Sequence, residues 1–340
     1  MPHTVTIQSS GHTFTVNDGE TVLAAALREG IVIAYGCRSG VCGTCKGRLL
    51  EGSVNYGTYQ EHAMTEAEKR AGMALFCQAK PLADLTIQCR EIGAAVAGIQ
   101  IKMLPARVVR MQRAAPDVML LDLKLPANER LRFLAGQYID LMLRGGTRRS
   151  FSMANAPHED GVLQLHLRDY GGPFSRHVFD VMKEKDIIRF EGPFGTFFLR
   201  EDSAKPIVLV ASGTGFAPIK AIVEHVLHTG VSRPMTLYWG CRVRADLYLH
   251  ELPEGWHRAG KLRYVPVLSD APASDHWSGR TGFVHRAVME DFPDLSGHQV
   301  YACGAPVMVD AAYRDFTSKC GLPDDEFFSD SFTPAAPASG

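Results

Sequence analysis

The sequence has no long apolar run and no concentration of charge of one sign. No stretch approaches the ~18 apolar residues that a membrane-spanning helix needs, and the start, Met-Pro-His-Thr-Val, lacks the basic and apolar regions of a signal peptide. Basic and acidic residues nearly balance, at 36 and 37, for a formal net charge of -1. Because no basic patch with interleaved aromatic residues occurs, we expect no nucleic-acid partner, and we also expect no membrane partner.

Cysteine is sparse for a disulfide-bonded secreted protein, since eight residues are spread over a chain of 340. A chain of this length can form two or three domains, each with its own core. Four of the cysteines follow a metal-ligand spacing, which fits a reducing compartment and predicts a cytoplasmic protein. The other four are expected to be small buried side chains, with Cys303 as the exception: Cys89, Cys241, Cys303 and Cys320.

Cys37, Cys42 and Cys45 have the spacing C-x4-C-x2-C, and Cys77 follows at a distance. Plant-type ferredoxins hold a 2Fe-2S cluster with cysteines at this spacing. The glycines and small residues between the cysteines let the backbone wrap a cluster and point amides at its sulfurs. A structural zinc site is the alternative, but it favours paired C-x2-C knuckles or His ligands. The spacing therefore predicts a 2Fe-2S centre that moves single electrons.

A ferredoxin domain of the β-grasp type is predicted for residues 1–93. Two alternating runs indicate a hairpin over 4–16. A helix follows Asp18 and Thr21, which suit its cap, and ends at Gly30. The remaining predicted elements are a strand, a short helix and a closing strand, over residues 46–51, 66–70 and 85–89.

Two further domains follow a linker of small, uncharged residues, placed at 94–102. Short alternating runs split by Gly and Pro predict an antiparallel β-barrel that binds FAD over 103–201. From 202 to 332, apolar strands alternate with helical stretches, one of them over 218–228, which indicates a doubly wound parallel sheet that binds NAD. Residues 333–340 are rich in Ala, Pro and Ser and are expected to be disordered. The predicted fold class is a multidomain α+β and α/β protein.

One predicted barrel strand, Arg148–Asn155, carries residues that suit a flavin. We expect Arg149, Phe151 and Ser152 to lie at alternate positions, and hence on one face. The guanidinium can neutralise a pyrophosphate, the ring can stack on the flavin, and the hydroxyl can hydrogen-bond a ring nitrogen. The alternative is an ordinary strand with a solvated Arg149 and a core Phe151.

A glycine loop in the same barrel favours the flavin. Gly171 and Gly172 precede Ser175, near which a helix is expected to begin. Backbone amides at a helix N-terminus bind anions readily. Two phosphate-suited features in one small domain therefore indicate a dinucleotide flavin.

The parallel sheet has a glycine turn after its first strand. Gly213–Gly215 leads with Pro218 into a helix, so that a pyrophosphate can approach the backbone and the helix N-terminus. A later turn, Cys303–Pro306, follows another strand and should lie along the same carboxyl edge of the sheet. Cys303 is therefore a candidate for lining the nicotinamide site, with plain packing as the alternative.

Together these motifs resemble the ferredoxin–NAD(P)H reductase superfamily, in its subgroup with an N-terminal plant-type ferredoxin domain, over residues 3–332. The family's R-x-Y-S is similar to Arg149–Ser152, and its C-G-x-P is similar to Cys303–Pro306. Phe151 departs from the family because it replaces the customary Tyr and lacks its hydroxyl. The segment before the tail resembles one that returns an aromatic ring to the flavin, which suggests Phe332.

The resemblance also implies which residues form the sites. Ser152 would support the reacting part of the flavin, Cys303 would shape the nicotinamide approach, and Phe332 would return towards the flavin. The residues expected to bind FAD or the nucleotide are Arg149, Ser150, Phe151, Ser152, His166, Leu167, Gly171, Gly172, Ser175, Gly213, Thr214, Gly215, Pro218, Arg242, Cys303 and Gly304.

The implied electron path runs from NADH to FAD, to the 2Fe-2S cluster and on to a partner protein. NADH delivers two electrons as a hydride, whereas the cluster accepts them singly, and the flavin joins the two processes. The resemblance implies an oxygenase component as partner. The alternatives are a dehydrase of deoxysugar biosynthesis, served by an enzyme of the CDP-6-deoxy-3,4-glucoseen reductase type, or a redox sensor without turnover. NADPH stays open because Arg242 and Arg244 could bind its 2'-phosphate. A monomer is expected.

Overall fold

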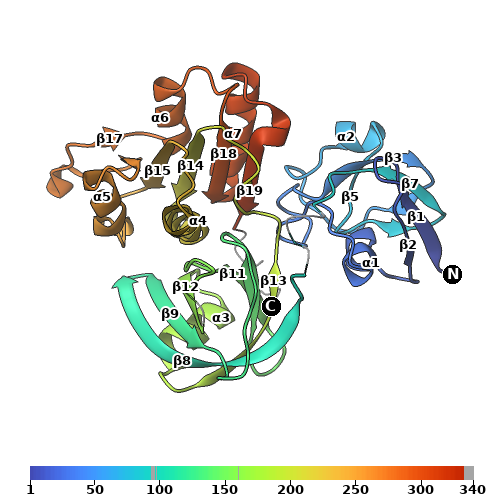
Figure 1. Ribbon diagram of the computed structural model, residues 1–340, viewed down its shortest axis with the longest axis horizontal. Coiled ribbons are helices and arrows are strands. Elements are labelled where there is room, and N and C mark those ends of the chain that lie inside the picture. The colour runs from blue at the N-terminus through green and yellow to red at the C-terminus, as the bar shows by residue number, and fades with distance from the viewer. Residues whose placement is uncertain (93–95, 97, 160, 333–340) are drawn as a thin grey trace. The chain divides into compact units, whose positions relative to one another are not determined.

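The structure, a computed structural model, describes residues 1–92, 96, 98–159 and 161–332 (Figure 1). The chain divides into two compact units, Met1–Ile99 and Gln100–Gly340. The division falls inside the predicted linker, of which residues 94, 95 and 97 lie outside the described part, as does the predicted tail. The barrel and the parallel sheet both belong to the second unit, so the boundary at residue 201 stays a prediction.

The first unit contains a five-stranded sheet in the order β2-β1-β7-β3-β5. Strands β1 and β7 are parallel, and the other neighbours are antiparallel. Thr21 caps the first helix as predicted, because its Oγ1 accepts from the amide of Ala24 at 3.2 Å. The elements are β1 (His3–Ile7), β2 (Thr13–Val16), α1 (Val22–Arg28), β3 (Lys46–Glu51), β4 (Val54–Asn55), α2 (Glu66–Arg70), β5 (Met73–Leu75), β6 (Lys80–Pro81) and β7 (Leu85–Gln88).

The second unit begins with a six-stranded antiparallel sheet in the order β11-β10-β13-β8-β9-β12. Met153 and Leu165 form a bridge where the edge strands β11 and β12 meet, which closes the sheet on itself. Large apolar side chains such as Leu121, Leu141 and Phe190 fill the interior. The elements are β8 (Lys102–Ala115), β9 (Val118–Lys124), β10 (Tyr138–Met142), β11 (Arg148–Ser152), β12 (Val162–Arg168), α3 (Pro173–Arg176), the π-helix η2 (His177–Val181) and β13 (Ile187–Phe194).

The rest of the second unit is a six-stranded parallel sheet in the order β17-β16-β15-β14-β18-β19. Helices cover both of its faces, with α4 and α5 on one and α6 and α7 on the other (Figure 1). The elements are β14 (Ile207–Ser212), η3 (Gly213–Gly215), α4 (Phe216–Thr229), β15 (Met235–Cys241), η4 (Arg244–Asp246), α5 (Glu251–Arg258), β16 (Arg263–Leu268), η5 (Ala273–Asp275), β17 (Arg280–Thr281), α6 (Val284–Asp291), β18 (Gln299–Gly304), α7 (Pro306–Lys319), η6 (Asp324–Glu326) and β19 (Phe327–Ser331).

One hydrophobic core spans the barrel and the parallel sheet. Val118 and Phe197 from the barrel side belong to the same buried cluster as Leu209, Ile222 and Trp239 of the sheet and its helix α4. Burial of this shared apolar surface favours one fixed arrangement of the two parts. The barrel and sheet are therefore held together as one packed body.

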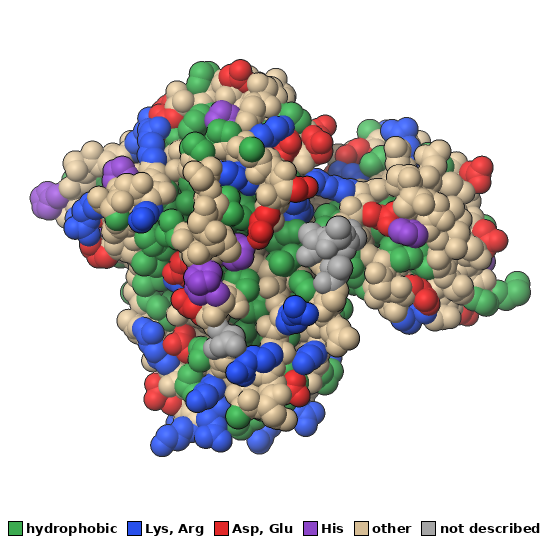
Figure 2. Space-filling view, viewed as in Figure 1, with side chains coloured by type: hydrophobic (Ala, Val, Ile, Leu, Met, Phe, Trp, Pro, Cys, Tyr) green, Lys and Arg blue, Asp and Glu red, His purple; other side chains and the backbone are tan. Residues whose placement is uncertain are grey.

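Charges of both signs lie on the surface, and the helices are short. On the face shown in Figure 2, basic and acidic side chains both occur. Among the described residues, every helix is too short or too polar to traverse a lipid bilayer.

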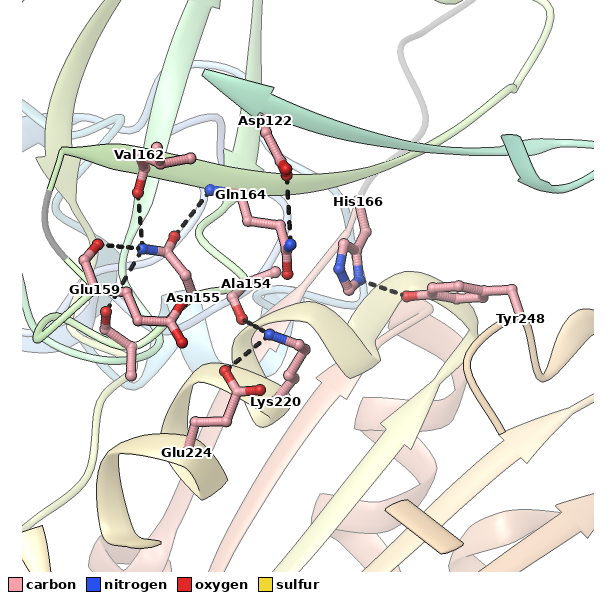
Figure 3. A network of polar contacts seen from close by, with 11 residues as sticks. Asp122, Ala154, Asn155, Glu159, Val162, Gln164, His166, Lys220, Glu224 and Tyr248 are labelled. Carbon is pink, nitrogen blue, oxygen red and sulfur yellow. Dashed lines mark hydrogen bonds and ion pairs between the residues drawn. The ribbon is translucent and has the colours of Figure 1, made fainter. Parts of the chain in front are cut away.

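A buried polar contact also links the barrel to the parallel sheet. His166 in β12 places its Nδ1 2.8 Å from the hydroxyl of Tyr248, and the two rings meet edge to face (Figure 3). Burial, with the nearby charge of Lys220 as a second cause, lowers the pKa of His166 from 6.5 to about 3. The imidazole is therefore neutral in the folded protein at ordinary pH.

The burial of His166 makes stability depend on pH. Between pH 6.5 and about 3 the unfolded chain binds a proton at His166 that the folded chain does not, so stability is lost as pH falls through this window. We expect His166→Phe to flatten this part of the pH dependence of the unfolding free energy. Urea unfolding followed by tryptophan fluorescence measures it, because all three tryptophans lie between residues 239 and 277. His62→Gln, at an exposed residue of the first unit, is the control and should keep the wild-type slope, whereas a wild-type slope in His166→Phe contradicts the prediction.

Candidate functional site

The four predicted cluster ligands lie in two segments of the first unit that the backbone joins. Cys37, Cys42 and Cys45 are in the loop before β3, and Cys77 follows β5. The amide of Phe76 donates to the carbonyl of Cys45 at 3.1 Å, which brings Cys77 beside the loop. All four thiols are free. The amide of Cys37 also lies 3.3 Å from the sulfur of Cys42.

Backbone amides converge on the sulfur of Cys37. Those of Ser39, Val41 and Cys42 lie 3.4, 3.4 and 3.3 Å from it. The loop can turn in this way because Arg38 and Gly40 adopt positive φ angles of 58° and 76°. The hydrogen bond with Cys42, followed by those from Ser39 and Val41, lowers the pKa of the Cys37 thiol. The loop thus favours a thiolate, which is the form that binds metal.

The number and spacing of the four cysteines suit a binuclear cluster. Among the described residues, no group of three or more His, Cys, Asp or Glu side chains gathers closely enough to hold one metal ion. A 2Fe-2S cluster divides its four ligands between two irons, and the four free thiols match the ligand number that it needs.

The flavin strand β11 corrects one prediction. Side chains alternate along a strand, so Arg149 and Phe151 share one face while Ser150 and Ser152 share the other. Ser150 donates from Oγ to Asp140 at 2.7 Å, and the Phe151 ring lies 5.3 Å from that of Phe174. The prediction that Ser152 shares a face with Arg149 and Phe151 is wrong because residues 151 and 152 are adjacent.

Ser152 instead reaches a residue that the sequence did not identify. Its hydroxyl donates to Oδ2 of Asp330 at 3.3 Å, and both residues are buried. Asp330 lies in β19, 178 residues further along the chain. The one clue in the sequence to Asp330 was its position in the segment just before Phe332. No local spacing relates Asp330 to Ser152, because the two residues are too far apart in the chain. A carboxylate therefore lies beside the hydroxyl expected to support the flavin.

The glycine loop of the barrel leaves room for a ligand. Helix α3 begins at Pro173, two residues before Ser175, and continues directly into the π-helix η2. Gly172 has an ordinary φ of -80°, and a Cβ there would meet no atom within 4 Å. Neither backbone strain nor protein packing requires glycine at this position. The backbone here is therefore open to close approach by a bound group.

The two predicted contacts on β12 point in opposite directions. Leu167 is part of the barrel core, so only its backbone is open to a flavin. His166 points out of the barrel to Tyr248, and its Nε2 is buried with no hydrogen-bond partner in the structure. Tyr248 itself was not identified from the sequence.

The nucleotide turn packs directly against a neighbouring strand. A Cβ on Gly215 would lie 2.1 Å from the carbonyl oxygen of Cys303, so only glycine permits this approach. Gly213–Gly215 forms a 3-10 turn with Thr214 buried, and α4 begins at Phe216 rather than at the predicted Pro218, which lies in its first turn. The turns after β14 and β18 therefore meet at one edge of the sheet, as predicted.

Cys303, Gly304 and Phe332 meet at the same edge. Gly304 has a φ of 139°, and a Cβ on it would lie 2.2 Å from Oγ of Ser212. The carbonyl of Gly304 accepts from the amide of Phe332 at 2.8 Å, and the Phe332 ring packs on the core. Cys303 is fully buried, and burial followed by the charge of Asp330 raises the pKa of its thiol. A protonated thiol can line a site but cannot act as a nucleophile.

Arg242 and Arg244 both lie close to carboxylates. The guanidinium of Arg242 is largely exposed and lies 3.2 Å from the carboxylate of Asp270. The amide of Arg244 donates to Asp275 at 3.1 Å. Both contacts are near the surface, where charge pairs contribute little, so they do not decide between NADH and NADPH.

Comparison with protein families gives three consecutive matches along the chain. A 2Fe-2S iron-sulfur cluster binding domain matches residues 5–82. An oxidoreductase FAD-binding domain matches 105–199, and an oxidoreductase NAD-binding domain matches 209–314. The matches confirm the expected 2Fe-2S, FAD and NAD cofactors and the order of the domains that bind them.

Known proteins resemble the chain over nearly its whole length. The CDP-6-deoxy-L-threo-D-glycero-4-hexulose-3-dehydrase reductase of Yersinia pseudotuberculosis is 40% identical, covering 98% of this chain and all of the relative. Terephthalate 1,2-dioxygenase reductase component 2 of a Comamonas species is 36% identical over 98% of both chains. The crystal structure of the Amycolatopsis cytochrome P450 reductase GcoB superposes with a TM-score of 0.79 at 35% identity, covering 98% of this chain and all of that one. This chain therefore belongs to the ferredoxin–NAD(P)H reductase superfamily, in the subgroup that joins an N-terminal 2Fe-2S domain to FAD- and NAD-binding domains.

Proposed function

We propose that this chain takes electrons from NADH and passes them through FAD and a 2Fe-2S cluster to a partner protein. The observation that carries the proposal is the presence, in one chain, of four free cysteines at the ferredoxin spacing ahead of flavin- and NAD-binding domains. A bound flavin supplies the chemistry that converts a two-electron hydride transfer into single-electron steps.

We assign the cluster to Cys37, Cys42, Cys45 and Cys77, whose thiolates would hold its irons. The amides that converge on Cys37 would stabilise the negative charge that an added electron brings, and so tune the potential of the cluster.

For the flavin, we assign Arg149 to the pyrophosphate, together with the open backbone at Gly171 and Gly172. Phe151 would stack on the ring system, and the hydroxyl of Ser152 would orient its reacting edge while Asp330 holds that hydroxyl. The remaining predicted flavin contacts are Ser150, His166, Leu167 and Ser175.

For the nucleotide, we assign the turn Gly213–Gly215 with Pro218, and Arg242 and Gly304 along the same edge. Cys303 would shape the approach of the nicotinamide, and Phe332 would cover the flavin from the end of β19. The hydride transfer itself requires no proton donor or acceptor, and the proton that arrives with the hydride would be released to water once both electrons have passed to the cluster.

The first candidate acceptor is the oxygenase component of a multicomponent oxygenase. Several relatives are reductase components of this kind, including those for terephthalate dioxygenase and phenol 2-monooxygenase. The second candidate is a dehydrase that acts on a CDP-linked deoxysugar, and it is favoured by the 40% identity to the dehydrase reductase of Yersinia. We further infer β-grasp, antiparallel-barrel and doubly wound sub-folds, a monomer, and a cytoplasmic location that keeps all eight cysteines free.

Reconstitution distinguishes the acceptors. The purified protein with NADH is mixed either with a terminal oxygenase or with a pyridoxamine-dependent sugar dehydrase, and NADH oxidation that depends on the added protein is measured. We expect sustained turnover with one of the two, and catalytic reduction of cytochrome c without either. Reduction that stops after one equivalent of NADH would indicate a sensor and contradict the proposal.

The order of the electron carriers predicts the effect of removing one cluster ligand. We expect Cys45→Ser to leave NADH-driven flavin reduction intact and to abolish cytochrome c reduction, because only the second process passes through the cluster. Stopped-flow absorption of the flavin and steady-state cytochrome c reduction measure the two. Cys89→Ser is the control, since Cys89 lies in the same unit but outside the ligand set, and it should keep both activities. Equal loss of both activities in Cys45→Ser would refute the order.

A further inference from the structure

A buried ammonium group connects the helix that follows the nucleotide turn to the end of the flavin strand. Lys220 in α4 is only 8% exposed, and its Nζ donates to the carbonyl oxygen of Ala154 at 3.0 Å (Figure 3). The same Nζ lies 2.8 Å from Oε2 of Glu224, one helical turn further along. The contact joins residues 66 apart in the sequence.

The presence of a lysine here is not explained by stability alone. Lysine is rarely buried, because removing its charge from water costs free energy that pairing only partly offsets. The surrounding helix already supplies apolar residues to the shared core, among them Ile219 and Val223. An apolar side chain at position 220 would pack at lower cost, but it could not bind the carbonyl of Ala154.

Both ends of this contact lie on rigid elements that carry parts of the site. Ala154 comes two residues after Ser152, and its own amide donates to the carbonyl of Gln164 in β12 at 2.7 Å. Lys220 lies five residues after Gly215, in a helix whose first turn is continuous with the nucleotide turn. The Lys220–Ala154 hydrogen bond therefore ties the strand that carries Ser152 to the helix that starts at the nucleotide turn.

We propose that Lys220 is a positioning residue for hydride transfer, which fixes the distance between the bound nicotinamide and the bound flavin by holding Ala154. The inference rests on the proposed function. In this step a hydride leaves NADH, which becomes NAD+, and both electrons reduce the flavin. Transfer requires the reacting atoms ~3–3.5 Å apart, and a shift of ~1 Å can cost ~100-fold in rate. The contact between Ser152 and Asp330 ties the same strand to β19, so the two contacts orient it together.

The test replaces the ammonium and measures the hydride step alone in the full-length holoprotein. In Lys220→Met we expect the rate of flavin reduction at saturating NADH to fall at least ~10-fold, since the strand and the helix are no longer tied. The apparent Kd for NADH, the FAD content and the iron content should stay within about twofold of wild type, because Lys220 is not assigned to bind either cofactor. Electron transfer from the dithionite-reduced protein to cytochrome c should be unchanged. Anaerobic stopped-flow absorption measures all the rates.

The control is His225→Gln, on the same helix. His225 contacts Glu201 at 2.7 Å, in a segment that follows the last barrel strand, so this variant should reduce its flavin at the wild-type rate. If Lys220→Met does not fold, Lys220→Gln is measured instead, and we expect the same loss because the shorter amide does not reach Ala154.

Each result decides the proposal. The proposal is overturned if either Lys220 variant reduces its flavin at the wild-type rate. It is also overturned if the loss of rate is explained entirely by lower FAD content, by weaker NADH binding or by slower electron transfer to cytochrome c. Failure of the proposed function is distinguishable, because the wild-type protein would then show no flavin reduction by NADH.

Discussion

The second unit depends on the hydrophobic core that the barrel and the parallel sheet share. Val118 and Phe197 pack in the same buried cluster as Trp239 and Ile222. A hydride can pass between two bound cofactors only if the surfaces that hold them keep a fixed separation. The shared core provides that constraint, and the polar contacts between the two parts refine it. They are His166 with Tyr248, Ser152 with Asp330, and Lys220 with Ala154.

Backbone geometry sets the other constraint, at the carboxyl edge of the sheet. Gly215 and Gly304 allow the turns after β14 and β18 to approach more closely than any side chain would permit. In the first unit, Arg38 and Gly40 use positive φ angles to direct amides at Cys37. In both places the chain uses backbone conformation to bring cofactor-binding groups together, and the side chains complete the sites.

Motifs with a fixed local spacing could be predicted from the sequence. The four cysteines, the glycine turn at Gly213–Gly215 and the alternation of strands and helices are local patterns, so they identified the cofactors and their order. The side-chain geometry of β11 was also local, but the expectation for Ser152 failed because adjacent strand residues face opposite ways.

Contacts between distant segments could not be predicted. Asp330, Tyr248 and Lys220 reach the barrel from elements that follow it in the chain, and each looks like an ordinary residue in the sequence. The burial of His166 likewise depends on how the two sheets pack against each other, and no local sequence pattern indicates that packing. The π-helix that follows α3 could not be predicted either, because helix type depends on packing as well as on propensity.

The most direct test of the account is the cofactor content of the purified protein, followed by anaerobic titration with NADH. We expect equal molar amounts of iron and inorganic sulfide, and about half as many moles of FAD as of iron. One 2Fe-2S cluster and one flavin per chain require these ratios. We also expect NADH to bleach the absorption of both centres. A protein that retains no flavin, lacks iron and sulfide, or holds both cofactors without their reduction by NADH would contradict the account.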